Sequence, residues 1–144
     1  ENFYGSKAKA HIGLYKLAKA GADPKAMISG IQHLKHALDL INRFKNLDTG
    51  YFYYHNYDER KIYFEIHRIL IEELLPSLLK SKESELNKIR PLKELLGYYG
   101  IIENVSKKTI QNAINDISCK IESEKKQFMP KDMDINTSGC TQIK

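Results

Sequence analysis

Apolar residues recur at helical spacing along nearly the whole chain, and no segment alternates polar and apolar residues over a useful strand length. The clearest stripe lies near residue 110 and consists of Ile110, Ala113, Ile114, Ile117 and Ile121. Residues at such intervals lie on one face of an α-helix. The spacing therefore predicts an all-α fold.

The length of 144 residues suits a single domain with an adequate core. We expect a bundle of about five helices over residues 1–128, followed by an irregular tail over residues 129–144. The bundle is predicted to begin with an antiparallel hairpin of two helices, near residues 6–20 and 24–44. No apolar run approaches the ~18 to 20 residues of a membrane-spanning helix, so no transmembrane segment is expected.

Single residues mark several expected helix ends. Asp23 followed by Pro24 is typical of a helix start, because Asp accepts a hydrogen bond from the first turn and Pro fits the first helical position. Ser106 is predicted to cap the last helix in the same way. Pro76 is expected to kink or end the helix that begins near Asp58, since proline has no N–H to donate and clashes with the preceding turn.

The excess positive charge lies in the N-terminal third of the chain. The net charge is +5, and residues 1–45 alone hold eight Lys or Arg against three Asp or Glu. We expect Lys9, Lys16 and Lys25 to steer an acidic protein partner towards this end, and nucleic acid is not excluded. The alternative is a solvated lysine face that only aids solubility.

In the helix near 6–20 the apolar residues Ala10, Leu14, Leu17 and Ala18 share one face, opposite Lys9 and Lys16.

Half of the fourteen aromatic residues fall within residues 51–64. We expect a loop or short turn here that leads into a helix at about Asp58, with Tyr63 and Phe64 in the core. The predicted binding surface consists of Tyr51, Tyr53, Tyr54, Tyr57 and Arg60, because Tyr and Arg supply much of the binding energy at protein interfaces. The predicted function is a non-enzymatic binding or regulatory domain that engages a protein partner and has no cofactor. If the tyrosines are buried, they belong to the core instead.

Arg60 and His67 lie two helical turns apart and so share a helix face. This Arg-x6-His spacing resembles the Arg-x4-6-His motif of the HEPN ribonucleases, whose Arg and His act at a cleft formed on dimerisation. The resemblance implies that Arg60 would stabilise phosphate charge and that His67 would transfer protons. The alternative is a hydrogen-bonded core histidine and an arginine paired with a nearby carboxylate.

A second alternative function is peripheral binding to an anionic lipid surface. Near residue 100 an apolar and aromatic corner stands beside basic residues: Tyr98, Tyr99, Ile101, Ile102, Lys107 and Lys108. Peripheral lipid binders combine these residue types. The other interpretation is that the apolar members seal the end of the bundle.

The histidines and cysteines give weaker signals. His33 and His36 are three apart on one predicted helix, a spacing that can share a metal, but no third ligand is spaced to complete a site. We therefore predict no metal.

Cys119 lies opposite the apolar stripe of the last helix, which predicts a free thiol. Cys119 and Cys140 are the two cysteines of the chain, and two are too few for the disulfide framework of a small secreted protein. We therefore expect the cytoplasm or another reducing compartment.

Overall fold

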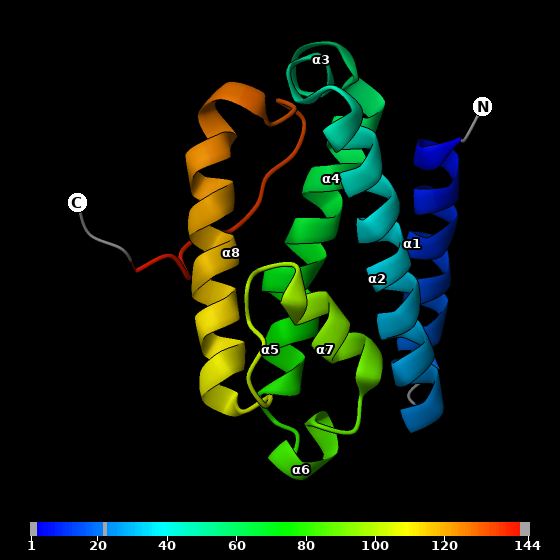
Figure 1. The fold of residues 1–144 in the computed structure, drawn as a ribbon, viewed down its shortest axis with the longest axis vertical. Coiled ribbons are helices and arrows are strands. Elements are labelled where there is room, and N and C mark those ends of the chain that lie inside the picture. Colours follow the sequence, from blue (N-terminus) through cyan, green and yellow to red (C-terminus); the bar gives the residue numbers. More distant parts are fainter. Residues whose placement is uncertain (1–2, 22, 142–144) are drawn as a thin grey trace. The chain divides into compact units, whose positions relative to one another are not determined.

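The computed structural model describes residues 3–21 and 23–141. These residues form helices and no strand, so the all-α prediction is confirmed (Figure 1). No helix in these ranges is long and apolar enough to cross a membrane. The helices are α1 (Tyr4–Ala20), α2 (Pro24–Leu47), α3 (Thr49–His55), α4 (Tyr57–Ile69), the π-helical η1 (Leu70–Leu74), α5 (Leu75–Leu78), α6 (Glu83–Leu86), α7 (Arg90–Gly97) and α8 (Lys107–Phe128).

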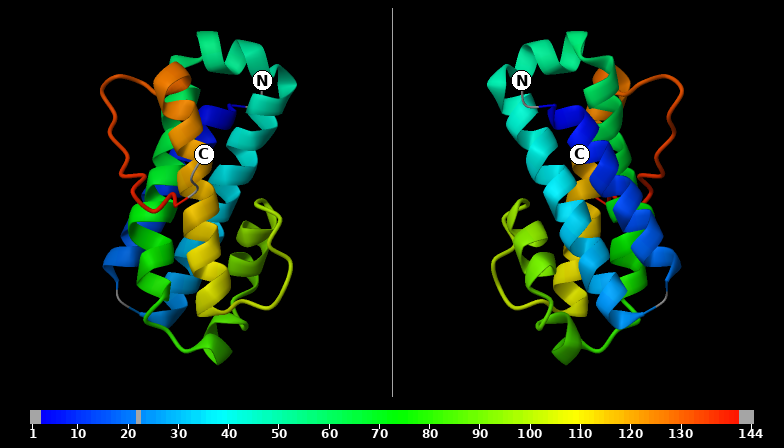
Figure 2. Two further views of the ribbon diagram at one scale, coloured as in Figure 1. Left: turned by 90° about the vertical axis from the view of Figure 1, so that its left-hand side faces the viewer. Right: turned by 90° about the vertical axis from the view of Figure 1, so that its right-hand side faces the viewer.

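The contacts of the chain divide it into two compact units, residues 1–66 and residues 67–144. In the first unit α1 and α2 lie side by side (Figures 1 and 2). Gly30 of α2 is buried where the two helices meet, and a Cβ there would lie 3.1 Å from the Cβ of Ala18. A larger residue at this position would push the helices apart.

The buried face of α1 differs from the apolar face that the sequence suggests. Leu14 and Leu17 are exposed, and the buried residues are Gly5, Ala8, Ile12 and Tyr15. The buried face combines large side chains with small ones, and Gly5 fits closely against Glu59 of α4, where a Cβ would lie 2.9 Å from the carboxylate. Because α1 has apolar residues on two faces, spacing alone could not tell which face the core takes.

The predicted helix starts are confirmed at both caps. The Asp23 carboxylate accepts a hydrogen bond from the Lys25 N–H at 3.3 Å, and Pro24 stands in the first turn of α2. Ser106 and Thr109 satisfy each other's backbone N–H groups at the start of α8. The predicted stripe of α8 is buried along its whole length: Ile110, Ala113, Ile114, Ile117 and Ile121.

Pro76 changes the type of helix rather than ending it. The chain stays helical to Leu78, but η1 precedes the proline, and the Leu75 N–H donates to the carbonyl of Leu70, five residues back. Proline has no N–H for the carbonyl four residues before it, and the wider π turn accommodates this loss.

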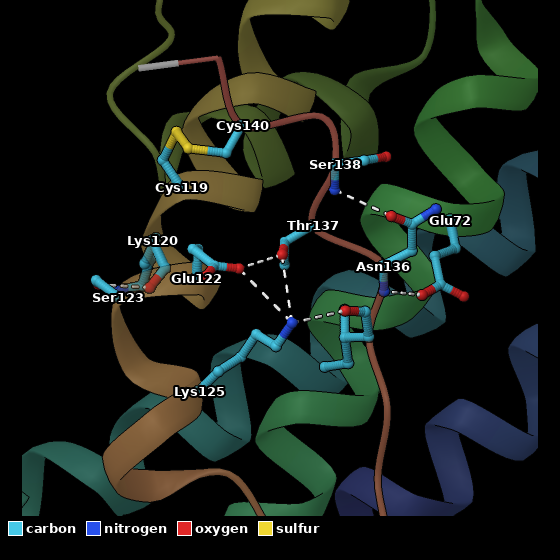
Figure 3. A network of polar contacts seen from close by, with 11 residues as sticks. Glu72, Cys119, Lys120, Glu122, Ser123, Lys125, Asn136, Thr137, Ser138 and Cys140 are labelled. Carbon is cyan, nitrogen blue, oxygen red and sulfur yellow. Dashed lines mark hydrogen bonds and ion pairs between the residues drawn. A yellow bond between two sulfur atoms is a disulfide. The ribbon is translucent and has the colours of Figure 1, made fainter. Parts of the chain in front are cut away.

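In the second unit the segment after α8 turns back and runs alongside that helix (Figures 1 and 2). This returning tail, residues 129–141, forms no helix or strand, yet its Ile135 is buried. The Thr137 hydroxyl donates to the Glu122 carboxylate, and the Lys125 ammonium donates to the Ile135 carbonyl at 3.3 Å (Figure 3). The Thr137 hydrogen bond and the charge of Lys125 lower the pKa of the Glu122 carboxyl.

Two further contacts fix the returning tail. The Asn136 N–H donates to the carboxylate of Glu72 at 2.7 Å, and Cys140 forms a disulfide with Cys119 of α8 (Figure 3). The prediction of a free thiol at Cys119 is therefore wrong. The cause is the chain reversal after α8, which brings Cys140 back to Cys119 and which no pattern in the tail sequence signals.

We expect loss of this disulfide to destabilise the protein without changing its helices. The bond closes a loop with a sequence separation of 21, so the Cys119→Ser/Cys140→Ser variant should lose about 3 kcal/mol of unfolding free energy. Urea denaturation followed by circular dichroism measures the difference. A thiol reductant should weaken the wild type similarly and leave the double variant unchanged; a wild type insensitive to reduction contradicts the prediction.

Candidate functional site

The aromatic segment is a helix and not the predicted loop. Residues Thr49–His55 form α3, and the Asp48 carboxylate accepts a hydrogen bond from the Tyr51 N–H at 3.0 Å, which caps the helix start. Helix α4 then begins at Tyr57, close to the predicted start. Because successive residues of a helix point about 100° apart, the aromatic side chains of α3 separate into buried and exposed sets.

The exposed set contains three of the four predicted tyrosines. Tyr51, Tyr54 and Tyr57 are 54%, 67% and 44% exposed. Tyr53 differs, since only 9% of it is exposed, and Phe52 beside it is buried as well. The structure therefore places Tyr53 in the core and leaves the other three at the surface.

Edge-to-face ring contacts hold the buried set in place. The Phe52 ring meets those of Phe44 and Tyr63 edge to face, at centroid distances of 6.1 Å and 5.7 Å. Tyr53 packs edge to face on Tyr63 at 6.3 Å. The Lys45 ammonium lies 5.6 Å from the Tyr53 ring centroid and 5.2 Å from that of Tyr63. These geometries are favourable for aromatic pairs and for a cation over a ring, so α3 is anchored firmly.

Arg60 links the end of α3 to the start of α4. Its guanidinium donates to the Tyr53 carbonyl at 2.8 Å, and its Cζ lies 5.6 Å from the ring centroid of Tyr57. The side chain is half-buried, so its charge has a fixed position beside an exposed tyrosine.

Two buried polar atoms at this junction make no hydrogen bond within the described part of the chain. They are the Nε of Arg60 and the side-chain oxygen of Asn56, the residue between α3 and α4. Buried polar groups are nearly always paired, and exceptions in native proteins call for an explanation such as a functional role. The junction of α3 and α4 is therefore the strongest candidate site in the first unit.

The three predicted lysines are all exposed. Lys9 and Lys16 lie on α1, and Lys25 lies in the first turn of α2. The Lys16 ammonium is 3.8 Å from a carboxylate oxygen of Glu65. The Lys16 side chain is 57% exposed and that of Glu65 24%, and at this long distance the pair contributes little to stability.

His67, the proposed catalytic histidine, lies in the last turn of α4 and is buried. Its Nε2 lies 2.9 Å from the hydroxyl of Tyr99, with which it shares a hydrogen bond. Burial, with the charge of Glu124, raises the pKa of Tyr99, so this phenol stays protonated. The sequence gives no signal of the contact, because thirty-two residues separate the two side chains.

The predicted lipid-binding corner is divided by exposure. Tyr98, Ile102, Lys107 and Lys108 are exposed, whereas Tyr99 and Ile101 are half-buried. Gly100 has a left-handed φ of 79°, which lets the chain turn sharply after α7. The corner therefore has one large exposed aliphatic side chain, that of Ile102.

Sequence reasoning missed a third histidine beside the predicted pair. His11 of α1 meets His33 with 2.9 Å between their Nδ1 atoms, and its ring stacks on that of His36 at 5.3 Å. His11 is twenty-two residues from His33, so only the packing of α1 on α2 reveals the cluster.

The histidine cluster is not arranged around a metal position. The Nδ1 atoms of His11 and His33 point at each other, and Nε2 of His36 contacts the amide nitrogen of Gln32 at 2.8 Å. Across residues 3–21 and 23–141, no group of three or more His, Cys, Asp or Glu residues is placed to hold a metal ion.

The chain matches no protein-family model, and neither a curated protein nor a solved structure matches it.

The different burial of neighbouring tyrosines predicts different effects on stability. Tyr53→Ala should cost about 3 to 5 kcal/mol of unfolding free energy, because it leaves a cavity among packed rings. Tyr54→Ala, one position further along α3, should change it by less than about 0.5 kcal/mol. Thermal and urea denaturation of the two variants test this pair, and similar losses would contradict the assignment of core and surface.

The histidine cluster predicts a loss of stability on acidification. Burial and the positive charges of His33 and His36 lower the pKa of His11 from its ordinary value of 6.5. Between pH 6.5 and that lowered pKa the unfolded chain binds more protons at this position, so stability is complete above pH 6.5 and falls as the pH drops through this window. Melting temperatures at pH 7.5 and pH 5.5 should show the loss. His11→Gln should reduce the difference, and an unchanged difference excludes His11 as the cause.

Proposed function

We propose that the chain is a helical bundle, beginning with an antiparallel hairpin of α1 and α2, that acts as a non-enzymatic binding or regulatory domain. Its partner is a protein, which it engages through Tyr51, Tyr54 and Tyr57. The observation that carries this proposal is the exposure of three large aromatic side chains around one anchored junction.

The arrangement suits binding for a physical reason. A tyrosine buries a large ring in an interface while its hydroxyl still makes a hydrogen bond, and only two side-chain torsions are lost. Because the rings of Phe52 and Tyr53 hold α3 in place, the exposed tyrosines start from a fixed backbone, and binding costs less ordering entropy.

Arg60 supports the same surface. Arginine and tyrosine are both enriched among the residues that dominate interface energies, and here the guanidinium lies over the ring of Tyr57. The Nε of Arg60 and the side-chain oxygen of Asn56, which make no hydrogen bond to any described residue, add a donor and an acceptor at the junction. A partner group or a water could complete these hydrogen bonds on binding.

The partner is expected to be acidic. Lys9, Lys16 and Lys25 are exposed on the hairpin of α1 and α2, and the charge excess of the chain lies in this region. Exposed lysines act mainly by speeding the encounter with a negative surface, so they set association rates more than final affinity.

The two alternative functions have less support. A ribonuclease would need His67 to reach a phosphodiester, but its ring is buried and bonded to Tyr99. Lipid binding would need a broad apolar surface, and of the corner's aliphatic residues only Ile102 is exposed.

The disulfide of Cys119 and Cys140 also argues against a reducing compartment, because such bonds persist in oxidising surroundings.

We expect Tyr51→Ala/Tyr54→Ala/Tyr57→Ala to weaken partner binding by tenfold or more, because a combined loss of about 1.4 kcal/mol over the three tyrosines already gives a factor of ten. The partner is first recovered on immobilised wild-type protein, and isothermal titration calorimetry then measures its affinity for each variant. The matched control is Tyr98→Ala, which removes an exposed tyrosine from the second unit. Unchanged affinity of the triple variant, with an unchanged melting temperature, would overturn the proposed surface.

A further inference from the structure

The side of α1 that faces away from its buried residues carries an exposed apolar stripe. Leu14 and Leu17 are 42% and 72% exposed, and Ala10, one turn before Leu14, is exposed too. These three residues define the outer face of α1. Positions 10, 14 and 17 align along one side of a helix, at the spacing found where one helix packs on another.

The core of the first unit does not need this stripe. Ala8, Ile12 and Tyr15 already bury the opposite side of α1. Exposing two leucines on adjacent turns of one helix has no benefit for the fold, and contiguous apolar surface of this kind marks an interaction site.

The charge of α1 indicates what the stripe binds. The helix holds Lys7, Lys9, Lys16 and Lys19 and no Asp or Glu. At 100° per residue, Lys7 lies at one edge of the outer face and Lys9 lies about 100° round the helix from its centre on the other side, whereas Lys16 points towards Glu65 of α4. A partner that covers the leucines therefore meets positive charge at both edges, and carboxylates at its own edges would complement them.

We infer that the outer face of α1 seats an acidic amphipathic helix of a partner protein. The inference rests on the proposed function in one respect, that the α1 lysines face an acidic partner, and it uses a surface separate from the α3 tyrosines. The apolar seam of the bound helix lies over Leu14 and Leu17, and its Asp or Glu residues face the flanking lysines.

The small side chains on and beside the outer face favour a helix over other partners. Ala10 lies on the stripe and Gly13 beside it, and a Cβ built on Gly13 would meet nothing within 4 Å. Small residues let a second helix approach closely, whereas insertion into lipid needs a continuous bulky apolar face. A second copy of this chain would bring a helix with four lysines and no Asp or Glu against the same helix, which like-charge repulsion disfavours.

The test uses a synthetic peptide of about 20 residues, matched to the length of α1, with Leu along one helical seam and Glu at both edges. A scrambled peptide of the same composition is the charge control. Fluorescence anisotropy should show binding of the seam peptide and at least about tenfold weaker binding of the scrambled one. Leu14→Ser/Leu17→Ser should also weaken binding at least about tenfold, because it removes two buried apolar contacts. Neither leucine belongs to the buried core, so the variant should keep its helix content and lose only a few degrees of melting temperature.

Three results would overturn the inference. Equal binding of the seam and scrambled peptides would show that charge alone acts. Sedimentation with phosphatidylserine vesicles that depends on Leu14 and Leu17, without peptide binding, would assign the face to lipid. Self-association that the double variant abolishes would assign it to a second copy. The Tyr51→Ala/Tyr54→Ala/Tyr57→Ala variant should bind the peptide as tightly as the wild type. If the wild type does not bind the peptide, while the triple tyrosine variant still loses affinity for the natural partner, this inference is wrong and the proposed function stands.

Discussion

The burial of Phe52 and Tyr53 is the constraint on which the candidate surface depends. Helix α3 has seven residues, and isolated helices of fewer than ~12 to 15 residues are marginal in water. Its helical form therefore needs contacts from outside itself. The rings of Phe44 and Tyr63, the Asp48 cap and the Arg60 hydrogen bond to the Tyr53 carbonyl supply them. Once Phe52 and Tyr53 point inwards, the helical turn places Tyr51 and Tyr54 outside.

Local signals in the sequence predicted part of this structure. The caps at Asp23 and Ser106 and the stripe of α8 act within a few residues, and each is confirmed. Three features were not predictable from local patterns. The helix at 51–55 depends on tertiary contacts, the buried side of α1 was ambiguous because the helix is apolar on two faces, and the Cys119–Cys140 bond depends on the path of the tail. Likewise, no spacing signals that His67 meets Tyr99 or that His11 meets His33.

The first unit uses its helices in two ways. One side of α1 and one side of α3 bury residues that determine the fold, and the opposite sides expose leucines or tyrosines. Substitutions on the outer sides are therefore expected to change stability less than substitutions on the buried sides. At the junction of α3 and α4, one buried atom each of Asn56 and Arg60 makes no hydrogen bond within residues 3–21 and 23–141, which adds a cost that stability alone does not explain.

The disulfide between Cys119 and Cys140 turns the end of the second unit into a covalent ring. The ring contains the last part of α8 and most of the returning tail, including the exposed Lys131. A protease that cuts once inside this ring opens the backbone but releases no fragment, because the sulfur bridge still joins both sides of the cut. Under oxidising conditions, the returning tail would therefore stay attached to α8 after a single cleavage.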